Sequence, residues 1–185
     1  MNLAVLGTGV LGGAIAKRLA ASGRAVTVYN RTREKAEQLR SSRIRLADSP
    51  EEAISQAAGV LLILADADAI DAVLSDSVLK YLTARTVIQM GTIGPRESLA
   101  LHRRVVAVHG DYFEAPVLGS VTEAHAGRLL VMVGATADQF TQWSDLLRCL
   151  SQHPRLVGAV GHAAALKLAL NQLIAAQTAA FARWS

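Results

Sequence analysis

The sequence has little of what several protein classes require. Its single cysteine, Cys149, excludes a disulfide framework within the chain and fits a reducing compartment such as the cytoplasm. No apolar run reaches the ~18 residues that span a bilayer, and the opening MNLAVLG breaks at Gly7 without the basic start of a signal peptide. Aromatic residues make up only 4%, so bases would find few stacking partners. We therefore expect a cytoplasmic protein that binds neither membranes nor nucleic acids.

Metal-binding patterns are also missing from the sequence. The five histidines show no ligand spacing, and neither HExxH nor CxxC occurs. An acid-rich stretch from Asp66 to Asp76 follows an apolar run, where Asp66 or Asp68 would cap a helix. Hard cations need more converging oxygens than one helix start provides. We expect no metal site.

What the chain does have is the composition of a globular protein. Hydrophobic residues make up 51% and charged residues 18% of its 185 residues, a length that suits one domain or one domain and the start of another. The net charge of +4 comes from scattered basic residues. A small ligand that carries phosphate explains this balance more simply than a nucleic acid does.

Strand-length apolar runs alternate with helix-length segments, the pattern of a doubly wound α/β fold with a parallel sheet. The expected strands are 3–7, 25–29, 44–47, 60–64, 86–90, 111–117, 129–134 and 155–160, and the expected helices are 10–22, 32–40, 50–57, 66–80, 95–109, 137–150 and 162–184. The runs 60–64 and 86–90 lack polar alternation, which predicts strands buried on both faces. We assign residues 1–160 to a Rossmann-type nucleotide-binding domain and 161–185 to the start of an interdomain helix.

A glycine-rich segment joins the first expected strand to the first expected helix. It reads Gly7-Thr8-Gly9-Val10-Leu11-Gly12. Gly7 permits a tight turn, Gly9 lets a pyrophosphate approach the backbone, and Gly12 allows the helix to pack closely on the strand. The helix N-terminus offers free N–H groups to the phosphates. The segment predicts dinucleotide binding.

The end of the second expected strand predicts which dinucleotide binds. An NAD site usually has an acid there for the ribose hydroxyls, but this chain has Asn30-Arg31-Thr32. The Arg31 guanidinium suits a 2′-phosphate, and Thr32 is expected to cap the next helix. The alternative is that Arg31 simply belongs to a solvated basic helix start. The position favours NADP(H).

Lys167 and Asn171 lie four residues apart in GHAAALKLALN, so they share one face of the last expected helix. An ammonium beside a carbonyl that receives hydride would donate a hydrogen bond and then a proton. Alone, Lys167 would be read more simply as a lysine that extends from a buried helix to solvent. That helix is apolar nearly all round, which predicts burial on several sides.

Four motifs, in this order, resemble those of the β-hydroxyacid dehydrogenases, the group of 3-hydroxyisobutyrate dehydrogenase and the glyoxylate/succinic semialdehyde reductases. They are GTGVLG at 7–12, MGT at 90–92, EAPVLGS at 114–120 and GHAAALKLALN at 161–171. The resemblance covers essentially the whole chain. The NRT segment and the opening Glu114 are similar to the glyoxylate reductase branch.

The resemblance implies roles for individual residues. Lys167 matches the catalytic lysine of the family, and Asn171 the asparagine one helical turn later. Gly119 and Ser120 match the loop that receives the substrate carboxylate, and Thr92 the threonine beside nicotinamide and substrate. The implied reaction is NADPH-dependent interconversion of a small aldehyde or keto acid with its hydroxy acid.

Two departures from the family pattern leave alternatives open. Leu118 stands where the family usually has a serine, which removes one hydroxyl contact to the substrate. The family's long helix leads into a helical second domain, whereas this sequence ends at Ser185. We therefore expect weak catalysis, and self-association, folding back or fraying of the last helix. The alternatives are a non-catalytic NADP-binding module or truncated remnant, and an imine reductase-like enzyme, against which the retained lysine argues.

Overall fold

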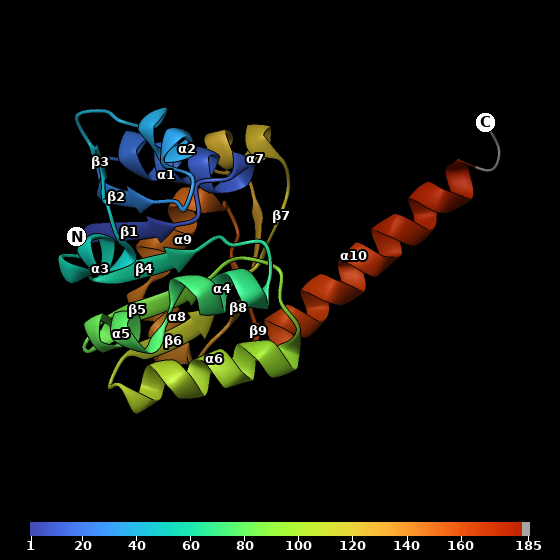
Figure 1. Ribbon diagram of the computed structural model, residues 1–185. Helices are drawn as coiled ribbons and strands as arrows, with labels where there is room; N and C mark the ends of the chain where they lie inside the picture. The colour runs from blue at the N-terminus through green and yellow to red at the C-terminus, as the bar shows by residue number, and fades with distance from the viewer. Residues whose placement is uncertain (183–185) are drawn as a thin grey trace.

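The computed structural model describes residues 1–182 and has the predicted α/β architecture (Figure 1). The strands of its sheet are β1 (Asn2–Leu6), β2 (Ala25–Tyr29), β3 (Ile44–Leu46), β4 (Gly59–Leu62), β5 (Thr86–Gln89), β6 (Asp111–Glu114), β7 (Val117–Leu118), β8 (Leu130–Gly134) and β9 (Arg155–Gly158). The helices are α1 (Val10–Ala21), α2 (Arg33–Glu37), α3 (Pro50–Ser55), α4 (Ala67–Val73), α5 (Asp76–Leu79), a 3₁₀ turn (Lys80–Leu82), α6 (Pro95–Ala107), α7 (Val121–Ala126), α8 (Ala137–Gln142), α9 (Ser144–Leu150) and α10 (His162–Phe181).

The strand order is β3-β2-β1-β4-β5-β6-β8-β7, with β9 paired to β8. The chain leaves β1 in one direction to form β2 and β3, then returns to form β4 on the other side of β1. Ligands of such sheets bind outside the carboxyl ends of the strands at this reversal. The doubly wound fold is confirmed, but the sheet is not wholly parallel, because β8 runs antiparallel to both β6 and β7.

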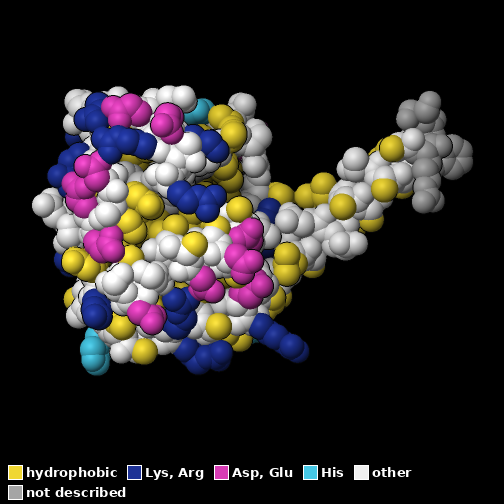
Figure 2. Space-filling model, in the orientation of Figure 1, with side chains coloured by type: hydrophobic (Ala, Val, Ile, Leu, Met, Phe, Trp, Pro, Cys, Tyr) yellow, Lys and Arg dark blue, Asp and Glu magenta, His cyan; other side chains and the backbone are white. Residues whose placement is uncertain are grey.

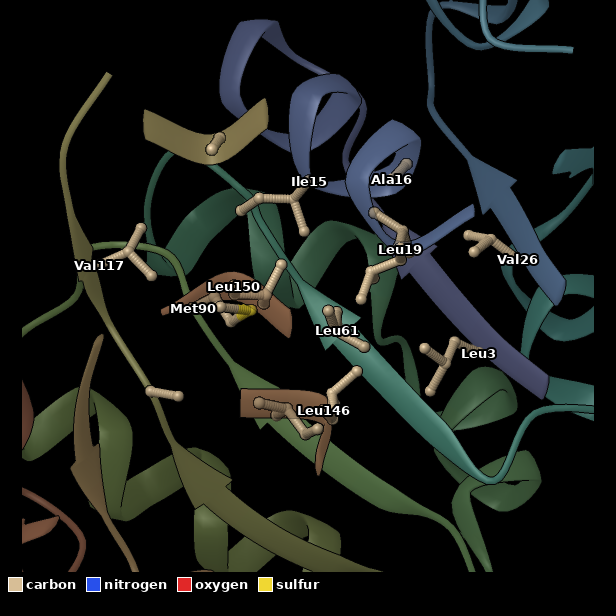
Figure 3. Packing of buried hydrophobic residues seen from close by; sticks show 14 of the residues in the cluster. Leu3, Ile15, Ala16, Leu19, Val26, Leu61, Met90, Val117, Leu146 and Leu150 are labelled. Carbon is tan, nitrogen blue, oxygen red and sulfur yellow. The ribbon is translucent and has the colours of Figure 1, made fainter. Parts of the chain in front are cut away.

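Hydrophobic side chains pack on both faces of the sheet. Leu3 of β1 belongs to the cluster that α1 and α9 cover, whereas Leu6 of the same strand belongs to the cluster under α3, α4 and α6. Figure 3 shows the first cluster, where Leu19 of α1 and Leu146 of α9 approach Leu61 of β4. All residues of β4 and β5 are buried, as their unbroken apolar runs predicted.

Three predicted elements are interrupted. The expected helix 66–80 divides into α4 and α5 because Leu74 leaves the helical conformation, and the expected helix 137–150 divides at the buried Trp143. The expected strand 111–117 divides into β6 and β7 at Pro116, which has no N–H for the ladder. The unpredicted α7 begins at a Ser120–Glu123 capping box and ends at the left-handed Gly127.

The expected burial of the last helix is wrong. Only Ala163, Ala164 and Lys167 of α10 are buried, and the helix then projects away from the sheet (Figure 1). Leu173 is 53% exposed and Phe181 is 78% exposed. An apolar sequence shows that a helix favours burial without showing what would bury it, and nothing within residues 1–182 covers the second half of α10. The expected end of the helix at 183–184 lies outside the described residues.

Candidate functional site

The glycine loop depends on glycine at two points. Gly7 has a φ of +99°, and a Cβ there would lie 2.3 Å from the Ile63 carbonyl oxygen. A Cβ at Gly12 would lie 2.1 Å from the carbonyl oxygen of Gly7. A Cβ at Gly9, in contrast, would meet nothing within 4 Å. The protein therefore packs closely behind the loop and leaves open space in front of Gly9, where a pyrophosphate would approach.

The Asn30 side chain connects the end of β2 to the glycine loop. Its Oδ1 accepts a hydrogen bond from the Thr8 N–H at 3.0 Å, and its Nδ2 donates to the Thr32 carbonyl at 2.9 Å. The Gly7 N–H also donates to the Tyr29 carbonyl at 2.9 Å. Asn30 thus replaces the usual acid and also fixes the loop. The predicted Thr32 cap is wrong, because the Thr32 side chain forms no capping hydrogen bond.

A cavity of about 290 Å³ lies over these residues. It is lined by Gly7 and Gly9, by residues 29–32, and by residues 63–65 after β4. Arg31 and Lys35 bring positive charge to its edge, and both are exposed. Within residues 1–182 no carboxylate pairs with Arg31, whereas Arg33 pairs with Asp48 and Glu37. The cavity therefore lies at the carboxyl ends of β1, β2 and β4, with the positive charge of Arg31 and Lys35 at its edge.

The rest of the predicted loop divides between a second cavity and the core. Thr8 and Val10 line a space of about 310 Å³ that also borders α7. Leu11 is half-buried and packs against the hydrophobic cluster under α1. Thr8, Val10 and Leu11 thus do not line the cavity beside Arg31.

Thr92 lies just after β5, next to the nucleotide cavity. A Cβ on its neighbour Gly91 would lie 2.6 Å from the carbonyl oxygen of Leu64, which lines that cavity. The chain then enters α6 at Pro95. The start of α10 packs there, because a Cβ at Gly161 would meet Leu99 and the Pro95 carbonyl at 3.6–3.9 Å. The loop of Thr92 therefore lies between the nucleotide cavity and α10.

Lys167 is 7% exposed and lies on the one buried face of α10, one turn after Ala163 and Ala164. Burial lowers the pKa of its ammonium below the ordinary 10.5, because loss of water disfavours the charged form. The solvent-directed alternative for Lys167 does not hold, because a lysine that extended to solvent would be exposed and Lys167 is buried. Asn171 is half-buried one turn later.

Gly119 and Ser120 lie at the end of β7 and are exposed. Gly119 has a φ of +137°, and the Ser120 hydroxyl accepts from the Thr122 N–H and donates to Glu123 at 2.5 Å. The hydrogen bonds that the Ser120 hydroxyl and the Ser120 backbone N–H donate to Glu123 lower the pKa of the Glu123 carboxyl. Within residues 1–182 no hydrogen bond joins this loop to Lys167 or Asn171. The loop of Gly119 and Ser120 and the Lys167 turn of α10 thus lie at the same end of the sheet without a hydrogen bond between them within the described residues.

Glu114 is the residue whose role the sequence did not reveal. Its carboxylate is 1% exposed at the carboxyl end of β6, and Oε1 accepts hydrogen bonds from the N–H groups of Gly161, Ala163 and Ala164 at 2.8, 2.7 and 3.0 Å. Oε2 accepts a short hydrogen bond from the Ser98 hydroxyl. The available signal was an acid inside the apolar strand DYFEAPV, because a buried carboxylate requires partners.

Comparison with known proteins agrees with this geometry. Residues 2–161 match the family described as the NAD binding domain of 6-phosphogluconate dehydrogenase. The chain belongs to this family. The resemblance to β-hydroxyacid dehydrogenases is confirmed as well: glyoxylate/succinic semialdehyde reductase 1 of Arabidopsis thaliana is 28% identical over 184 residues, which cover 98% of this chain and 64% of that protein.

Solved structures of the same fold include both dehydrogenases and imine reductases. The 3-hydroxyisobutyrate dehydrogenase of Mycobacterium tuberculosis, solved with L-serine, has a TM-score of 0.92 at 24% identity, over 98% of this chain and 62% of that one. An imine reductase from Myxococcus stipitatus in complex with NADP+ has a TM-score of 0.91 at 26% identity, over 98% and 64%. The chain thus spans slightly less than two thirds of the length of these three proteins.

Within residues 1–182, no three His, Cys, Asp or Glu side chains gather in a group that could hold a metal ion. The Asp66 side chain instead accepts the Ala69 N–H at 2.8 Å and caps α4, as predicted. In the same part of the chain, no helix combines the length and the apolar character needed to cross a membrane.

Proposed function

We propose that this chain takes part in the NADPH-dependent reduction of a small aldehyde or keto acid to its hydroxy acid, with Lys167 as proton donor. The observation that carries the proposal is the burial of Lys167 on α10, whose start packs beside the Thr92 loop. Within residues 1–182 no carboxylate pairs with Lys167, and an unpaired buried ammonium is costly in a purely structural role. The burial of Lys167 suits a group that donates a hydrogen bond and a proton to a developing alkoxide.

The preference for NADPH is supported by the end of β2. Arg31 is exposed at the edge of the nucleotide cavity, and Asn30 leaves no acid there to repel a 2′-phosphate. A guanidinium bonds phosphate with two parallel N–H groups. The Myxococcus stipitatus neighbour is a complex with NADP+, which is consistent with this preference.

The proposed chemistry assigns one proton to Lys167. When bound, reduced nicotinamide would supply the hydride that the carbonyl carbon accepts. The Lys167 ammonium donates a hydrogen bond to the carbonyl oxygen, stabilises the charge that develops there, and transfers one proton to it. The resulting amine recovers a proton from water. The Gly119 and Ser120 backbone would hold the substrate carboxylate, and Asn171 would orient the substrate beside Lys167.

The test is the oxidation of NADPH in the presence of glyoxylate, succinic semialdehyde or a cyclic imine, followed for wild-type chain and for Lys167→Ala. We expect turnover with at least one of the two carbonyl acids, and a loss of about 1,000-fold or more in the variant with NADPH affinity unchanged. Full activity in Lys167→Ala would refute the assignment. NADPH binding without turnover of any substrate would favour a non-catalytic module, and turnover of the imine alone would favour the imine reductase alternative, which the similar structure supports.

A further inference from the structure

The start of α10 has an unusual source of hydrogen-bond acceptors. The first N–H groups of a helix have no partner within the helix, and a preceding Ser, Thr, Asp or Asn usually supplies one. The residue before α10 is Gly161, in a left-handed conformation and without a side chain. Glu114 supplies the missing acceptor from another strand, 47 to 50 residues away in sequence.

A carboxylate is well matched to this position. Its negative charge faces the positive end of the helix dipole, and one oxygen accepts three backbone N–H groups. The other oxygen is held by Ser98, whose hydroxyl also lies 2.8 Å from that of Tyr112. All three of these side chains are buried. The carboxylate is therefore fixed on both sides.

The Glu114 carboxylate occupies the space that the missing side chain of Gly134 leaves open. A Cβ at Gly134 of β8 would lie 2.4 Å from Oε1 of Glu114. Any side chain at Gly134 would push the carboxylate away from the N–H groups that it binds. The position of the Glu114 carboxylate thus requires glycine at 134, where β6 pairs with β8.

The placement of Lys167 depends on the same contact. Lys167 follows Ala164 by three residues and lies on the same face of α10. No residue of α10 after Lys167 is buried, so the first turns are the part that fixes the helix on the sheet. A shift of these turns would move the Nζ atom of Lys167 directly.

We propose that Glu114 is the positioning residue of the site: its buried carboxylate holds the first turn of α10 and thereby places Lys167 at the carboxyl end of the sheet. This role deepens the proposed function and rests on it for its effect on turnover. A misplacement of about 1 Å in a reacting group costs roughly 100-fold in rate. The affinity for NADPH should not change when Glu114 is replaced, because Glu114 does not line the nucleotide cavity.

The experiment compares the wild-type chain with Glu114→Ala, Glu114→Gln and Gly134→Ala. Glu52→Gln is the matched control, since the Glu52 carboxylate accepts the Asp48 N–H at 2.7 Å next to the start of α3. Each protein is assayed for kcat and KM with NADPH and glyoxylate or succinic semialdehyde, for NADPH affinity by calorimetry, for amide exchange at residues 161–167, and for the Lys167 pKa by NMR.

For Glu114→Ala we expect kcat to fall by about 100-fold, with NADPH affinity within about twofold and exchange at 161–167 faster by at least about tenfold. The Lys167 pKa should rise towards 10.5, because a loosened helix admits water. Glu114→Gln keeps an oxygen within reach of the three N–H groups, so it should recover most of the protection and most of kcat. Glu52→Gln should match wild type.

Two results would overturn the proposal. Wild-type exchange at 161–167 in Glu114→Ala would show that the carboxylate does not hold the helix, whatever happens to kcat. A wild-type kcat despite faster exchange would show that the contact does not place Lys167. If Glu114→Ala does not fold, Gly134→Ala and Glu114→Gln decide by the same measurements. If wild type reduces no carbonyl acid, the proposed function fails by itself, and exchange together with the Lys167 pKa still decides whether Glu114 holds the lysine.

Discussion

α1 and α10 both start at the carboxyl end of the sheet, and each carries one half of the proposed function. α1 is held along its whole length, with buried residues from Gly12 to Ala20, and it contacts α7 and α9 as well as the sheet. α10 is longer but is buried only as far as Lys167. The nucleotide end, which consists of the glycine loop and the nucleotide cavity, is thus supported along the whole of α1. The lysine end, which consists of Lys167 and Asn171, depends on the first buried turns of α10.

Because of this difference in packing, loss of a leucine side chain should destabilise the fold far more in α1 than in α10. Leu19 of α1 is fully buried, so Leu19→Ala should lower the free energy of unfolding by about 2–5 kcal/mol, because it leaves a cavity. Leu173 of α10 is 53% exposed, so at concentrations low enough to keep the chain monomeric Leu173→Ala should change the free energy of unfolding by less than about 0.5 kcal/mol. Urea denaturation of both variants at such concentrations checks the contrast. Equal losses there would mean that α10 folds back and is buried within the monomer.

At higher concentration we expect the chain to self-associate through the exposed apolar face of α10. Figure 2 shows hydrophobic side chains along this helix and little charge beyond its base. Each large apolar side chain removed from water stabilises a complex by about 1.5–3 kcal/mol. Sedimentation of the wild-type chain should reveal an associated species that Ile174→Lys weakens. A monomer at all concentrations would count against this expectation.

At the nucleotide end, Gly9→Ala separates binding from folding. The new Cβ would meet no protein atom within 4 Å, so stability should stay within about 1 kcal/mol. The same Cβ would stand where a pyrophosphate approaches the loop, and NADPH affinity should fall at least about tenfold. Calorimetry and thermal denaturation measure the two effects. An unchanged affinity would place the phosphates elsewhere.

Arg31→Ala tests the choice of cofactor. It should lower the ratio of NADPH to NADH affinity by about tenfold, equivalent to about 1.4 kcal/mol, by removing the guanidinium from the 2′-phosphate. Arg33→Ala is the control, since Arg33 is exposed and already pairs with Asp48. A similar loss of preference in both variants would show a general effect of positive charge instead of a specific contact.

The smallest effect is the pH dependence that follows from Lys167. Its pKa lies below 10.5 in the folded chain, so the ammonium that donates the proton is lost as pH rises through that lowered value. The rate of reduction should therefore decline at a pH below 10.5. Between the folded and unfolded pKa values the unfolded chain binds more protons, so this group adds stability as pH rises. A rate that stays constant up to pH 10.5 would contradict the role of Lys167.

Much of this molecule could be predicted from its sequence because the signals are local. The alternation of apolar runs and the glycine loop determine the doubly wound sheet and the place of Asn30 and Arg31. The unpredicted α7 also has a local signal, the Ser120-x-x-Glu123 box. The position of Glu114 in an apolar strand indicates only that its carboxylate needs partners, and nothing local identifies them, since the contacts join residues 47 to 50 positions apart. The course of α10 likewise depends on tertiary contacts that apolar character alone does not specify.

If the nucleotide end and the lysine end form one site, NADPH must bind close to Lys167. An NMR titration with NADPH that follows the Lys167 side chain, with the exposed Lys80 as internal control, measures this proximity. We expect saturation with NADPH to shift the Lys167 signals and the Lys167 pKa while Lys80 stays unchanged. Saturable NADPH binding that leaves Lys167 unaffected would contradict this expectation, because the cofactor and the proposed proton donor would then occupy separate places.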